Sequence, residues 1–442
     1  MSLFDGKRLS PSVFKIDRRR VRAGHYTDQY FNHAARVLGV LAREGYRFSG
    51  EARRLDVPAS ALSRVRVGNI HVEMQIFARR EPETIVCGTD YAIALLHTCA
   101  GHTTAAGRFV STGSKLEIDS VHDGERAEPW VPVMKVRGRY RDFAHLETVV
   151  LGVLSRGSRV ATNVYRTVKA AHGKPVFFFP ARYDLLHNQP LDGYAYVIGV
   201  GRYNFETRGE SPVLFSTDAQ GEWLKRPGGG TAPHAYVLAF LGDTAEAMLQ
   251  FARVLDPEVK RIALVDTNND CVGDSVATGK AFFGRYRELT DAGRATEAGR
   301  YVLFAVRLDT AGNLRDVSVP ASDDPECGPG VCPRLVRNVR RALDDLGDEI
   351  DVPDAWRSRA RDYFRNVKIV ASGGFDTERV AAFESASVPA DLYGIGTSFL
   401  RGDVNEFTAD IVRVKVRGRW HEMAKVGRKP IDNPRLRPVP PA

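Results

Sequence analysis

Cysteine and long apolar runs are scarce in this chain of 442 residues. Its five cysteines form an odd and sparse set (Cys87, Cys99, Cys271, Cys327 and Cys332), which favours reduced thiols over a disulfide framework. No apolar run approaches the roughly 18 residues that a membrane-spanning helix needs. The first residues contain no apolar stretch that ends in a cleavage site. We therefore expect a cytoplasmic protein that does not associate with a membrane.

Familiar metal and nucleotide motifs are also missing. The acidic segment from Asp266 resembles a calcium loop, but Cys271 replaces the required glycine and Ala277 the bidentate glutamate. A nearby glycine–lysine pattern resembles a P-loop, but its spacing is one residue too long and Ala281 stands where serine or threonine is needed. The last two cysteines lack a second pair of ligands and make a poor zinc site. We assign no residue as a metal ligand.

The charge of the chain is unbalanced towards the positive side. It has 63 basic and 54 acidic residues, a formal net charge of +9. The densest basic runs, residues 15–22 and 417–437, show no aromatic pattern suited to stacking bases. The excess charge fits either a solvated surface or the attraction of a small polyanion, and we expect no nucleic-acid partner. The hydrophobic content of 43% is ordinary, and the length indicates two or three domains.

The chain changes character after Gly173. Residues 60–140 are rich in short strand-like runs, and Phe143–Ala171 carries apolar residues at helical spacing. Beyond it, apolar runs alternate with helical stretches, which indicates βα units and a parallel sheet. We predict strands at Pro175–Phe179, Tyr194–Val200, Arg261–Val265, Tyr301–Val306, Val367–Ala371 and Leu392–Ile395. We predict helices at Thr244–Leu255, Val276–Leu289, Cys332–Leu346, Asp354–Phe364 and Thr377–Ser385.

Most of the predicted strands end abruptly in polar residues or glycine. The residues at these ends are Arg182, Asp266, Arg307 with Asp309, Ser372-Gly373-Gly374, and Gly396-Thr397. In α/β barrels the active site lies at the carboxyl ends of the strands. The pattern therefore predicts a barrel-like active site at these ends.

Two glycine-containing strand ends follow one another. Ser372-Gly373-Gly374 ends one predicted strand, and Gly396-Thr397 ends the next. Glycines let backbone N–H groups close around an anion, and the last two strands are the usual phosphate position in barrels. Tight turns need glycine as well, so turn formation alone is the alternative interpretation.

Arg307 and Asp309 stand two residues apart and therefore share a face of their strand end. A guanidinium can hold a carboxylate, and a carboxylate can hold sugar hydroxyls or a magnesium-bound water. A purely structural arginine–aspartate pair is the alternative. The segment from Gly228 to His234 adds three glycines, Thr231 and a histidine before a helix-like stretch. His234 is then either structural or a residue that contacts or accepts a phosphate.

Together these segments resemble one family, the nicotinate phosphoribosyltransferases, which are relatives of the quinolinate and nicotinamide enzymes with the type II phosphoribosyltransferase fold. The resemblance is carried, over nearly the whole chain, by Tyr26–Tyr30, Gly230–His234, Leu264–Thr267, Arg307–Thr310, Ala371–Gly374, Gly394–Ser398 and Lys425–Lys429.

The resemblance implies an α/β fold: an incomplete, TIM-like α/β barrel plus an α/β sandwich domain formed by both chain ends. Residues 1–150 would form the first part of the sandwich, residues 151–400 the barrel with its phosphate site, and residues 401–442 a β segment that returns to the sandwich. It also implies a homodimer or a dimer-based oligomer with the active site at the interface.

The resemblance also implies roles for particular residues. The pyridine ring and its carboxylate would be held by Tyr30, Thr231, Arg307 and Arg182. The 5-phosphate would be held by Ser372, Gly373, Gly374, Gly396 and Thr397. The catalytic residues would be His234, which family members transiently phosphorylate, with Asp266 and Asp309 near the sugar and its magnesium.

The implied reaction transfers the phosphoribosyl group of phosphoribosyl pyrophosphate to nicotinate in NAD biosynthesis, with Mg²⁺ as cofactor and ATP as an optional co-substrate. Tyr183 stands where the family has a second arginine after Arg182, and Asn313 stands where many members have a carboxylate. These departures leave quinolinate and nicotinamide open as alternative bases. A phosphate-binding barrel lyase or isomerase is the alternative outside the family.

Overall fold

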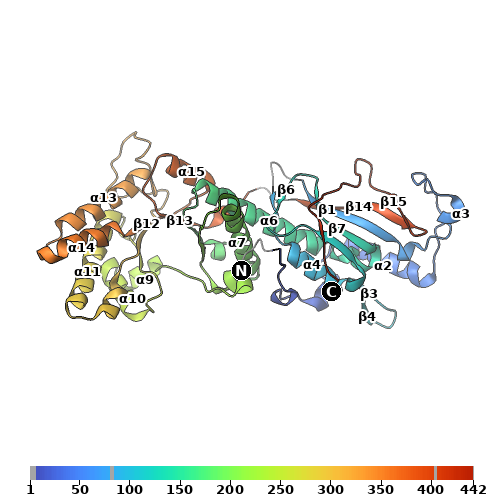
Figure 1. The fold of residues 1–442 in the computed structure, drawn as a ribbon, viewed down its shortest axis with the longest axis horizontal. Coiled ribbons are helices and arrows are strands. Elements are labelled where there is room, and N and C mark those ends of the chain that lie inside the picture. The colour runs from blue at the N-terminus through green and yellow to red at the C-terminus, as the bar shows by residue number, and fades with distance from the viewer. Residues whose placement is uncertain (1–5, 80–83, 403–405, 442) are drawn as a thin grey trace. The chain divides into compact units, whose positions relative to one another are not determined.

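The computed structural model describes residues 6–79, 84–402 and 406–441, which divide into two compact units. Unit 1 takes its residues from Met1–Thr162, Val197–Phe205 and Asp403–Ala442, and unit 2 from Asn163–Tyr196 and Glu206–Gly402. In Figure 1 the blue and red segments, from the two ends of the chain, share the sheet of unit 1. Both ends of the chain therefore build one unit.

Unit 1 contains an antiparallel sheet of six strands in the order β15-β14-β1-β7-β5-β16. These strands are β1 (His71–Ala78), β5 (Glu117–Ser120), β7 (Pro132–Arg139), β14 (Phe407–Val416), β15 (Arg419–Glu422) and β16 (Arg437–Pro438). The short pairs are β2 (Thr84–Ile85) with β6 (Arg126–Ala127), and β3 (Gly101–Thr103) with β4 (Phe109–Ser111). Along β1 the apolar Val72, Met74 and Ile76 alternate with Glu73 and Gln75, so one face of the sheet is apolar.

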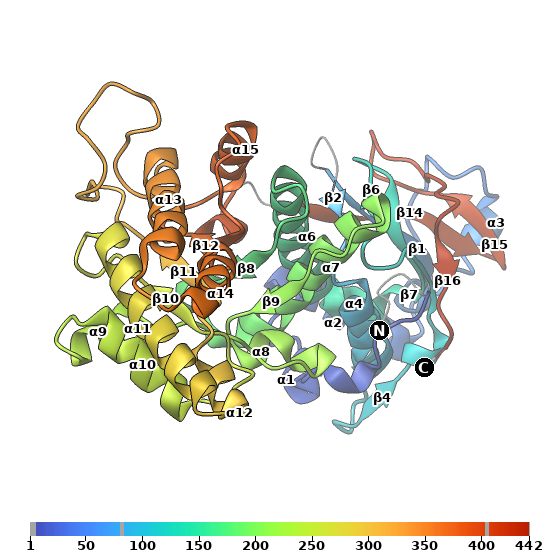
Figure 2. The same cartoon turned by 60° about the vertical axis from the view of Figure 1, so that its left-hand side comes forward.

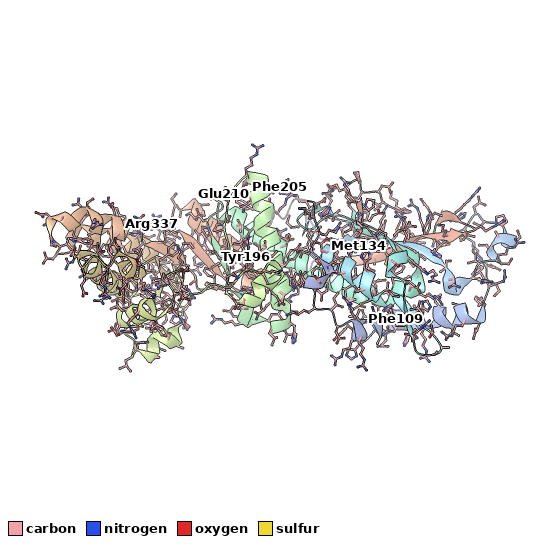
Figure 3. The ribbon with its side chains drawn as sticks, turned by 60° about the horizontal axis from the view of Figure 1, so that its bottom comes forward. Phe109, Met134, Tyr196, Phe205, Glu210 and Arg337 are labelled. Atoms are coloured by element: carbon pink, nitrogen blue, oxygen red, sulfur yellow. The ribbon has the colours of Figure 1, made fainter. Side chains whose placement is uncertain are left out.

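Helices cover this apolar face. The helices that begin in unit 1 are α1 (Arg18–Arg22), α2 (Gln29–Glu44), α3 (Ala59–Leu62), α4 (Thr89–Cys99), α5 (Tyr140–Phe143) and α6 (Glu147–Ala170). Leu96 of α4 and Leu154 of α6 join Met134 of β7 in the same buried cluster. Figure 3 labels Met134 in this core. The 3₁₀ turn Val67–Asn69 packs on α2, where a side chain at Gly68 would meet the backbone of Ala42 at 2.3 Å.

Unit 2 contains a sheet of six parallel strands in the order β10-β11-β12-β13-β8-β9. The strands are β8 (Val176–Phe178), β9 (Val213–Phe215), β10 (Ile262–Leu264), β11 (Ala305–Leu308), β12 (Lys368–Ala371) and β13 (Leu392–Ile395). Their facing side chains, Ile262, Ala305, Val370 and Leu392, form one buried cluster. The parallel order puts the carboxyl ends of all these strands at one edge.

The helices of unit 2 connect these strands, as a parallel sheet requires. They are α7 (Gln189–Thr207), which also enters unit 1, α8 (Asp218–Gly221), α9 (His234–Ala239), α10 (Thr244–Val254), α11 (Cys271–Asp291), α12 (Ala295–Ala298), α13 (Pro333–Glu349), α14 (Asp354–Arg365) and α15 (Thr377–Ser385). Figure 2 shows α10, α11, α13 and α14 packed side by side along the strands β10 to β12. Aspartates cap α10, α11 and α15 by accepting a backbone N–H in the first turn: Asp243, Asp270 and Asp376.

One predicted strand is wrong. The run Tyr194–Val200 lies inside helix α7, and all of its residues are buried. A helix that is buried on every side shows the same continuous apolar run as a buried strand, so periodicity does not separate the two. Tyr196 explains why this helix is enclosed: its hydroxyl donates to the carbonyl of Val176 at 2.6 Å and accepts from the N–H of Leu214 at 3.0 Å. Figure 3 labels this side chain.

Other boundaries shift less. The strand predicted at Tyr301–Val306 begins later, at Ala305, because a 3₁₀ turn occupies Gly299–Tyr301. Strand β9 was not predicted. The expected fold class, an incomplete barrel of α/β type plus a second sheet domain, is confirmed by the curled parallel sheet and by the separate antiparallel sheet. None of the described helices is both long and apolar enough to cross a membrane.

Candidate functional site

A pocket of about 530 Å³ lies at the carboxyl ends of the parallel strands of unit 2. The predicted site residues that line it are Arg182, Thr231, Arg307, Asp309, Ser372, Gly373, Gly374, Gly396 and Thr397. Other lining residues are Phe179, Ala181, Tyr183, Ser216, Gly229, Gly230, Ala232, Pro233, Phe375 and Gly394. The folded sheet therefore brings most of the predicted site together from segments far apart in the sequence.

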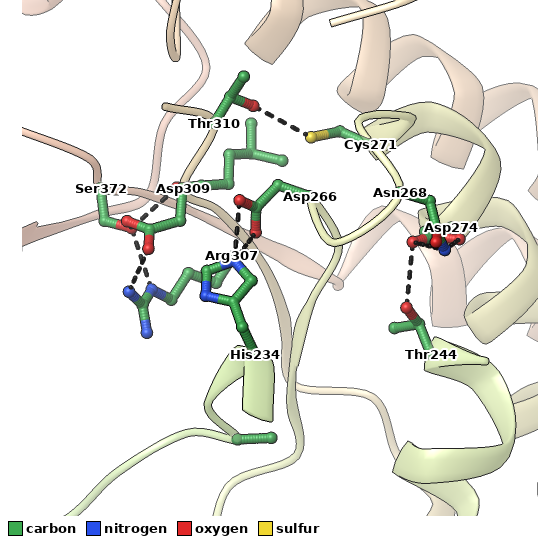
Figure 4. A network of polar contacts seen from close by, with 12 residues as sticks. His234, Thr244, Asp266, Asn268, Cys271, Asp274, Arg307, Asp309, Thr310 and Ser372 are labelled. Atoms are coloured by element: carbon green, nitrogen blue, oxygen red, sulfur yellow. Dashed lines mark hydrogen bonds and ion pairs between the residues drawn. The ribbon is translucent and has the colours of Figure 1, made fainter. Parts of the chain in front are cut away.

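Arg307 is the centre of a polar network in this pocket (Figure 4). Its Nε donates to Oγ of Ser372 at 3.0 Å, and its Nη1 donates to Oγ1 of Thr231 at 3.1 Å. Its Nη2 pairs with Asp309 at 3.0 Å. Ser372 in turn donates to the other carboxylate oxygen of Asp309 at 2.7 Å. These contacts fix both the position and the orientation of the guanidinium.

The contacts of Arg307 leave donors free for a ligand. Each contact uses one N–H group, so one N–H remains on each terminal nitrogen. Two parallel N–H groups of one guanidinium are what a bidentate carboxylate requires. The guanidinium carbon also lies 5.1 Å from the ring centroid of Phe179, and that ring stacks on Phe177 at 4.5 Å. The pocket thus presents a cation beside an aromatic face.

The two glycine turns behave differently. Gly373 and Gly374 have φ of 84° and 77°, a left-handed conformation that side chains rarely adopt. A side chain at Gly373 would meet the carbonyl oxygen of Thr310 at 3.3 Å, whereas the space at Gly374 is open up to Arg379 at 4.0 Å. Gly396 has negative φ, and a side chain there would meet the ring of Tyr183 at 2.8 Å. The first turn thus needs glycine for its backbone and the second for close packing.

His234 begins helix α9 and contacts Asp266, which follows β10. Its Nε2 lies 2.9 Å from both carboxylate oxygens of Asp266. The aspartate side chain is 8% exposed and the histidine 41%, so a ligand can reach the imidazole but hardly the carboxylate. Burial raises the pKa of Asp266, while its hydrogen bond to His234 works in the opposite direction. Neither residue lines the pocket itself, but Asp309 lies close enough to Asp266 to raise its pKa further.

Arg182 lines the pocket from the 3₁₀ turn Pro180–Tyr183. Its Nη2 donates to the hydroxyl of Tyr183 at 3.1 Å, and its guanidinium lies over that ring. Tyr183, which stands in place of a second arginine, is 48% exposed. It therefore adds an aromatic wall rather than a second positive charge.

Tyr30 is the predicted substrate residue that belongs to unit 1. It lies in the first turn of α2, is 64% exposed, and its hydroxyl donates to Asp28 at 3.4 Å. The same carboxylate accepts from Thr148 at 2.8 Å. Its ring lies 4.4 Å from that of Phe31, centroid to centroid, and most of the side chain remains exposed to solvent.

Within residues 6–79, 84–402 and 406–441, no group of three or more histidine, cysteine or acidic side chains could hold a metal ion. Asp266 and Asp309, the two carboxylates at the site, each contact a histidine or an arginine through their oxygens. Such carboxylates are poor direct ligands for Mg²⁺, which prefers free oxygens in octahedral geometry. The structure thus gives no protein cage for a metal at this site.

Phe179 lines the pocket but was not predicted as a site residue. The run Phe177-Phe178-Phe179 was predicted only as part of a strand, and Arg182 was the residue predicted to bind substrate at its end. A signal was present, because Phe177 and Phe179 alternate with Phe178 and therefore share one face at the strand end. Gly394 on the neighbouring strand confirms how close this ring lies, since a side chain there would meet Phe179 at 2.8 Å.

Comparison with known proteins gives relatives for both units. Residues 56–158 match the family profile of the quinolinate phosphoribosyl transferase N-terminal domain. A nicotinate phosphoribosyltransferase of Mycobacterium tuberculosis, pncB1, is 26% identical over 291 residues, which make up 65% of this chain and 50% of that protein. The chain thus spans about half the length of the curated relatives it matches.

Solved structures share the fold. A nicotinate-nucleotide pyrophosphorylase from Pyrococcus furiosus aligns with a TM-score of 0.62 and 24% identity, over 97% of this chain and 86% of that one. The human nicotinic acid phosphoribosyltransferase aligns with a TM-score of 0.51 and 16% identity, over 88% of this chain and 75% of that one. At these identities the likeness shows the fold.

Proposed function

We propose that this chain is a member of the type II phosphoribosyltransferase family, in line with its partial match to that family's N-terminal profile, and that it transfers the phosphoribosyl group of phosphoribosyl pyrophosphate to nicotinate. The products are nicotinate mononucleotide and pyrophosphate, in a step of NAD biosynthesis. The observation that carries the proposal is the arrangement of Arg307 in the pocket, with free N–H groups, beside the ring of Phe179 and the glycine turns.

The pocket suits a flat aromatic carboxylate. The free N–H groups of Arg307 would receive the carboxylate, the hydroxyl of Thr231 would support it, and Phe179 would lie against the pyridine ring. Nicotinamide lacks the negative charge and would leave this cation unmatched. Quinolinate has a second carboxylate. Because Tyr183 is uncharged, Arg182 would be the one cation of this turn that could pair with it.

The reaction needs orientation and charge stabilisation rather than proton transfer. The lone pair of the pyridine nitrogen forms a bond to C1 of the ribose, while the bond from C1 to the pyrophosphate oxygen breaks and its electrons leave with pyrophosphate. The ribose becomes cationic in the transition state, and the carboxylate of Asp309 lies in the pocket to stabilise it. The backbone N–H groups around Gly373 and Gly374 would fix the 5-phosphate.

Magnesium would come with the substrate. The oxygens of Asp266 and Asp309 already contact other side chains, so phosphate oxygens of phosphoribosyl pyrophosphate are the better ligands for Mg²⁺. Bound there, the ion would neutralise charge on the leaving pyrophosphate.

ATP would act as an optional co-substrate through His234. The imidazole nitrogen that does not contact Asp266 is free to attack the terminal phosphorus of ATP, and ADP leaves with the bond electrons. The carboxylate of Asp266 would accept a hydrogen bond from the other nitrogen and hold the ring in place. Three glycines precede this segment and give it access to different backbone conformations.

A dimer is part of this proposal. Helix α2 has no buried residue, although apolar side chains on and beside it include Tyr26, Tyr30 and Val37 with exposures of 45%, 64% and 56%. Exposed apolar surface of this kind marks an interface. A second copy of the chain is the occupant that the family resemblance implies, and light scattering at micromolar concentration measures it directly.

Mass spectrometry of products tests the proposed reaction. The intact protein receives phosphoribosyl pyrophosphate, Mg²⁺ and an equimolar mixture of nicotinate, nicotinamide and quinolinate, with and without ATP. We expect nicotinate mononucleotide to dominate. If nicotinamide mononucleotide is the main product, nicotinamide is the preferred substrate. If carbon dioxide is released from quinolinate faster than nicotinate is consumed, quinolinate is the preferred substrate. Either result contradicts the proposal.

The alternative of a barrel lyase or isomerase gains no support from the pocket. Such enzymes use a Schiff-base lysine or an acid–base pair at the strand ends. No lysine occurs among the described lining residues, and Asp309 is held by Arg307 and Ser372.

A further inference from the structure

A second hollow of about 320 Å³ lies in unit 1, at the end of the antiparallel sheet. Its walls are the segment around the 3₁₀ turn Val67–Asn69 and the hairpin between β14 and β15. The charged side chains that line it are Arg64, Arg66, Lys415 and Arg417, and His71 joins them. Among the described residues that line it, none is acidic. We name it the β14–β15 basic pocket.

The cations of this pocket have no anionic partner among the residues that the structure describes. Arg64, Arg66 and Arg417 are exposed and make no ion pair or side-chain hydrogen bond with a described residue, and Lys415 lies over the ring of Trp420. Elsewhere in unit 1 arginines face carboxylates: Arg8 with Asp90, Arg137 with Glu73 and Asp119, and Arg428 with Asp410. Like charges that gather without such partners repel one another, and a bound anion would offset this repulsion.

The geometry of the hairpin adds an independent observation. Val416 pairs with Arg419, so Arg417 and Gly418 form a two-residue turn in which both φ angles are positive, 50° and 79°. Such turns favour asparagine or glycine at both positions, because a side chain strains the left-handed backbone. An arginine at the strained position indicates that its charge serves a purpose there.

The opposite wall is held rigidly. Gly68 approaches helix α2 so closely that a side chain would meet the backbone oxygen of Leu38 at 2.5 Å. The turn that carries Gly68 therefore packs directly on the backbone of α2, and Arg66 and Asn69 on either side of it line the pocket. Burial is the main cause of the lowered pKa of His71, and the positive charges of Arg139 and Lys415 act in the same direction.

We propose that the β14–β15 basic pocket is a second anion-binding site, which takes the polyphosphate group of a small molecule or inorganic polyphosphate itself. Arginine and lysine supply hydrogen-bond donors only, and several such cations around one hollow match several phosphate charges better than one carboxylate. None of the lining residues belongs to the pocket of unit 2. The inference therefore does not rest on the proposed function.

Titration calorimetry of the intact protein with inorganic tripolyphosphate tests this site. The pocket variant combines Arg64→Gln, Arg66→Gln and Arg417→Asn. The matched control removes the same charge from exposed arginines of unit 2, by Arg253→Gln, Arg294→Gln and Arg357→Gln. A Gly374→Val background blocks the phosphate cradle of unit 2, so that the remaining binding belongs to the basic pocket.

We expect the pocket variant to bind tripolyphosphate at least tenfold more weakly and the control to bind as the wild type does, with affinity that falls as salt rises. Equal affinity in the pocket variant overturns the proposal, whether or not Gly374→Val changes binding in unit 2. A parallel titration with ATP separates the sources, because tighter binding than tripolyphosphate identifies a nucleotide. A single-stranded oligonucleotide is titrated as well. If it binds more tightly than tripolyphosphate and ATP, and if this binding is lost in the pocket variant, the pocket binds nucleic acid and the proposal is wrong.

A single substitution separates a binding role of Arg417 from a structural one. Asparagine tolerates the left-handed backbone, so Arg417→Asn should raise the melting temperature while it weakens tripolyphosphate binding. A lower melting temperature with unchanged binding means that Arg417 supports the hairpin, and contradicts the proposal.

Discussion

The side chain of Arg307 is held at three of its nitrogens and is only 15% exposed, so its role depends on geometry as much as on charge. Lysine keeps the charge but cannot reach Ser372, Thr231 and Asp309 together or bind a carboxylate through two parallel N–H groups. We expect Arg307→Lys to lower kcat/KM for nicotinate by about 10- to 100-fold, from the loss of charged hydrogen bonds worth about 1.5–3 kcal/mol. Steady-state kinetics with nicotinate and nicotinamide measure the change.

The control for this prediction is Arg357→Lys, an exposed arginine that pairs with Asp354 on α14. Its kinetics should match those of the wild type. If the Arg307→Lys enzyme keeps full selectivity for nicotinate over nicotinamide, another residue binds the carboxylate.

His234 is predicted to accept a phosphoryl group from ATP. His234→Ala should abolish the label transferred from γ-labelled ATP and the stimulation by ATP, while slow synthesis without ATP continues. Asp266→Asn should reduce the labelling rate, because the amide holds the imidazole less firmly than the carboxylate does. Acid-labile, alkali-stable phosphohistidine is the measured product, and His187→Ala, an exposed histidine of unit 2, is the control. Equal label in His234→Ala would assign the acceptor elsewhere.

Glu147 makes the stability of unit 1 depend on pH. Burial raises the pKa of this carboxyl to about 8, and the carboxylates of Asp410 and Asp28 act in the same direction. The folded protein therefore holds the proton more tightly than the unfolded chain. This contribution to stability is complete below pH 4.5, the ordinary pKa of the group, and is lost as the pH rises towards 8, at about 1.4 kcal/mol per pKa unit.

Glu147→Gln should remove this loss. We expect the variant to be more stable than the wild type at pH 9 and equal to it or less stable at pH 5, as measured by urea unfolding at both values. Glu378→Gln, an exposed glutamate in the first turn of α15, should show no such dependence. Parallel stability curves for wild type and Glu147→Gln would mean that the carboxyl ionises normally.

At the scale of elements, the turn after β12 tests whether glycine there serves binding as well as conformation. Gly374→Ala costs about 1 kcal/mol for a side chain at positive φ, and its methyl group would stand in the space assigned to the phosphate. Gly293→Ala carries the same strain, φ of 73° with nothing within 4 Å, far from the pocket lining. We expect both variants to lose similar stability but only Gly374→Ala to lose affinity for phosphoribosyl pyrophosphate, by tenfold or more in calorimetry. If Gly374→Ala and Gly293→Ala bind phosphoribosyl pyrophosphate with equal affinity, Gly374 serves only to form the turn.

The elements show what the sequence could predict and what it could not. Strand ends such as Ser372-Gly373-Gly374 could be predicted from the sequence, because glycine and polar residues interrupt an apolar run where a strand ends in a turn. The helical structure of Tyr194–Val200 could not be predicted. A helix buried on all sides has no alternation of apolar and polar residues, so its sequence does not differ from that of a buried strand. Phe179 was overlooked because an aromatic at a strand end has no polar signature. The contact of His234 with Asp266 joins segments whose distance only the folded sheet determines.

At the scale of the whole molecule, ligand binding should act on unit 2 first. The pocket lining comes entirely from unit 2, so phosphoribosyl pyrophosphate stabilises the folded form of that unit by mass action. At about 100 times the dissociation constant this amounts to about 2.7 kcal/mol. We expect calorimetry to show an upward shift of about 5–10 °C in the transition of unit 2, since 1 kcal/mol shifts the melting temperature of a unit of this size by about 2–4 °C. Tripolyphosphate with the Gly374→Val variant should shift the transition of unit 1 instead. A shift of both transitions by either ligand would show that the units unfold together.

The pairing of β1 with β14 has a consequence for how the protein is made. Val72 pairs with Val414, and Val176 of β8 pairs with Tyr393, so each sheet is complete only after strands that the ribosome synthesises much later than the first ones. Until then the nascent chain carries open strand edges beside apolar surface, the state in which chains aggregate. A stop codon before Phe407 would remove the central partner of β1 and leave unit 1 permanently in that state. Production of this protein is therefore expected to depend on chaperones that bind the nascent chain until β14 has emerged.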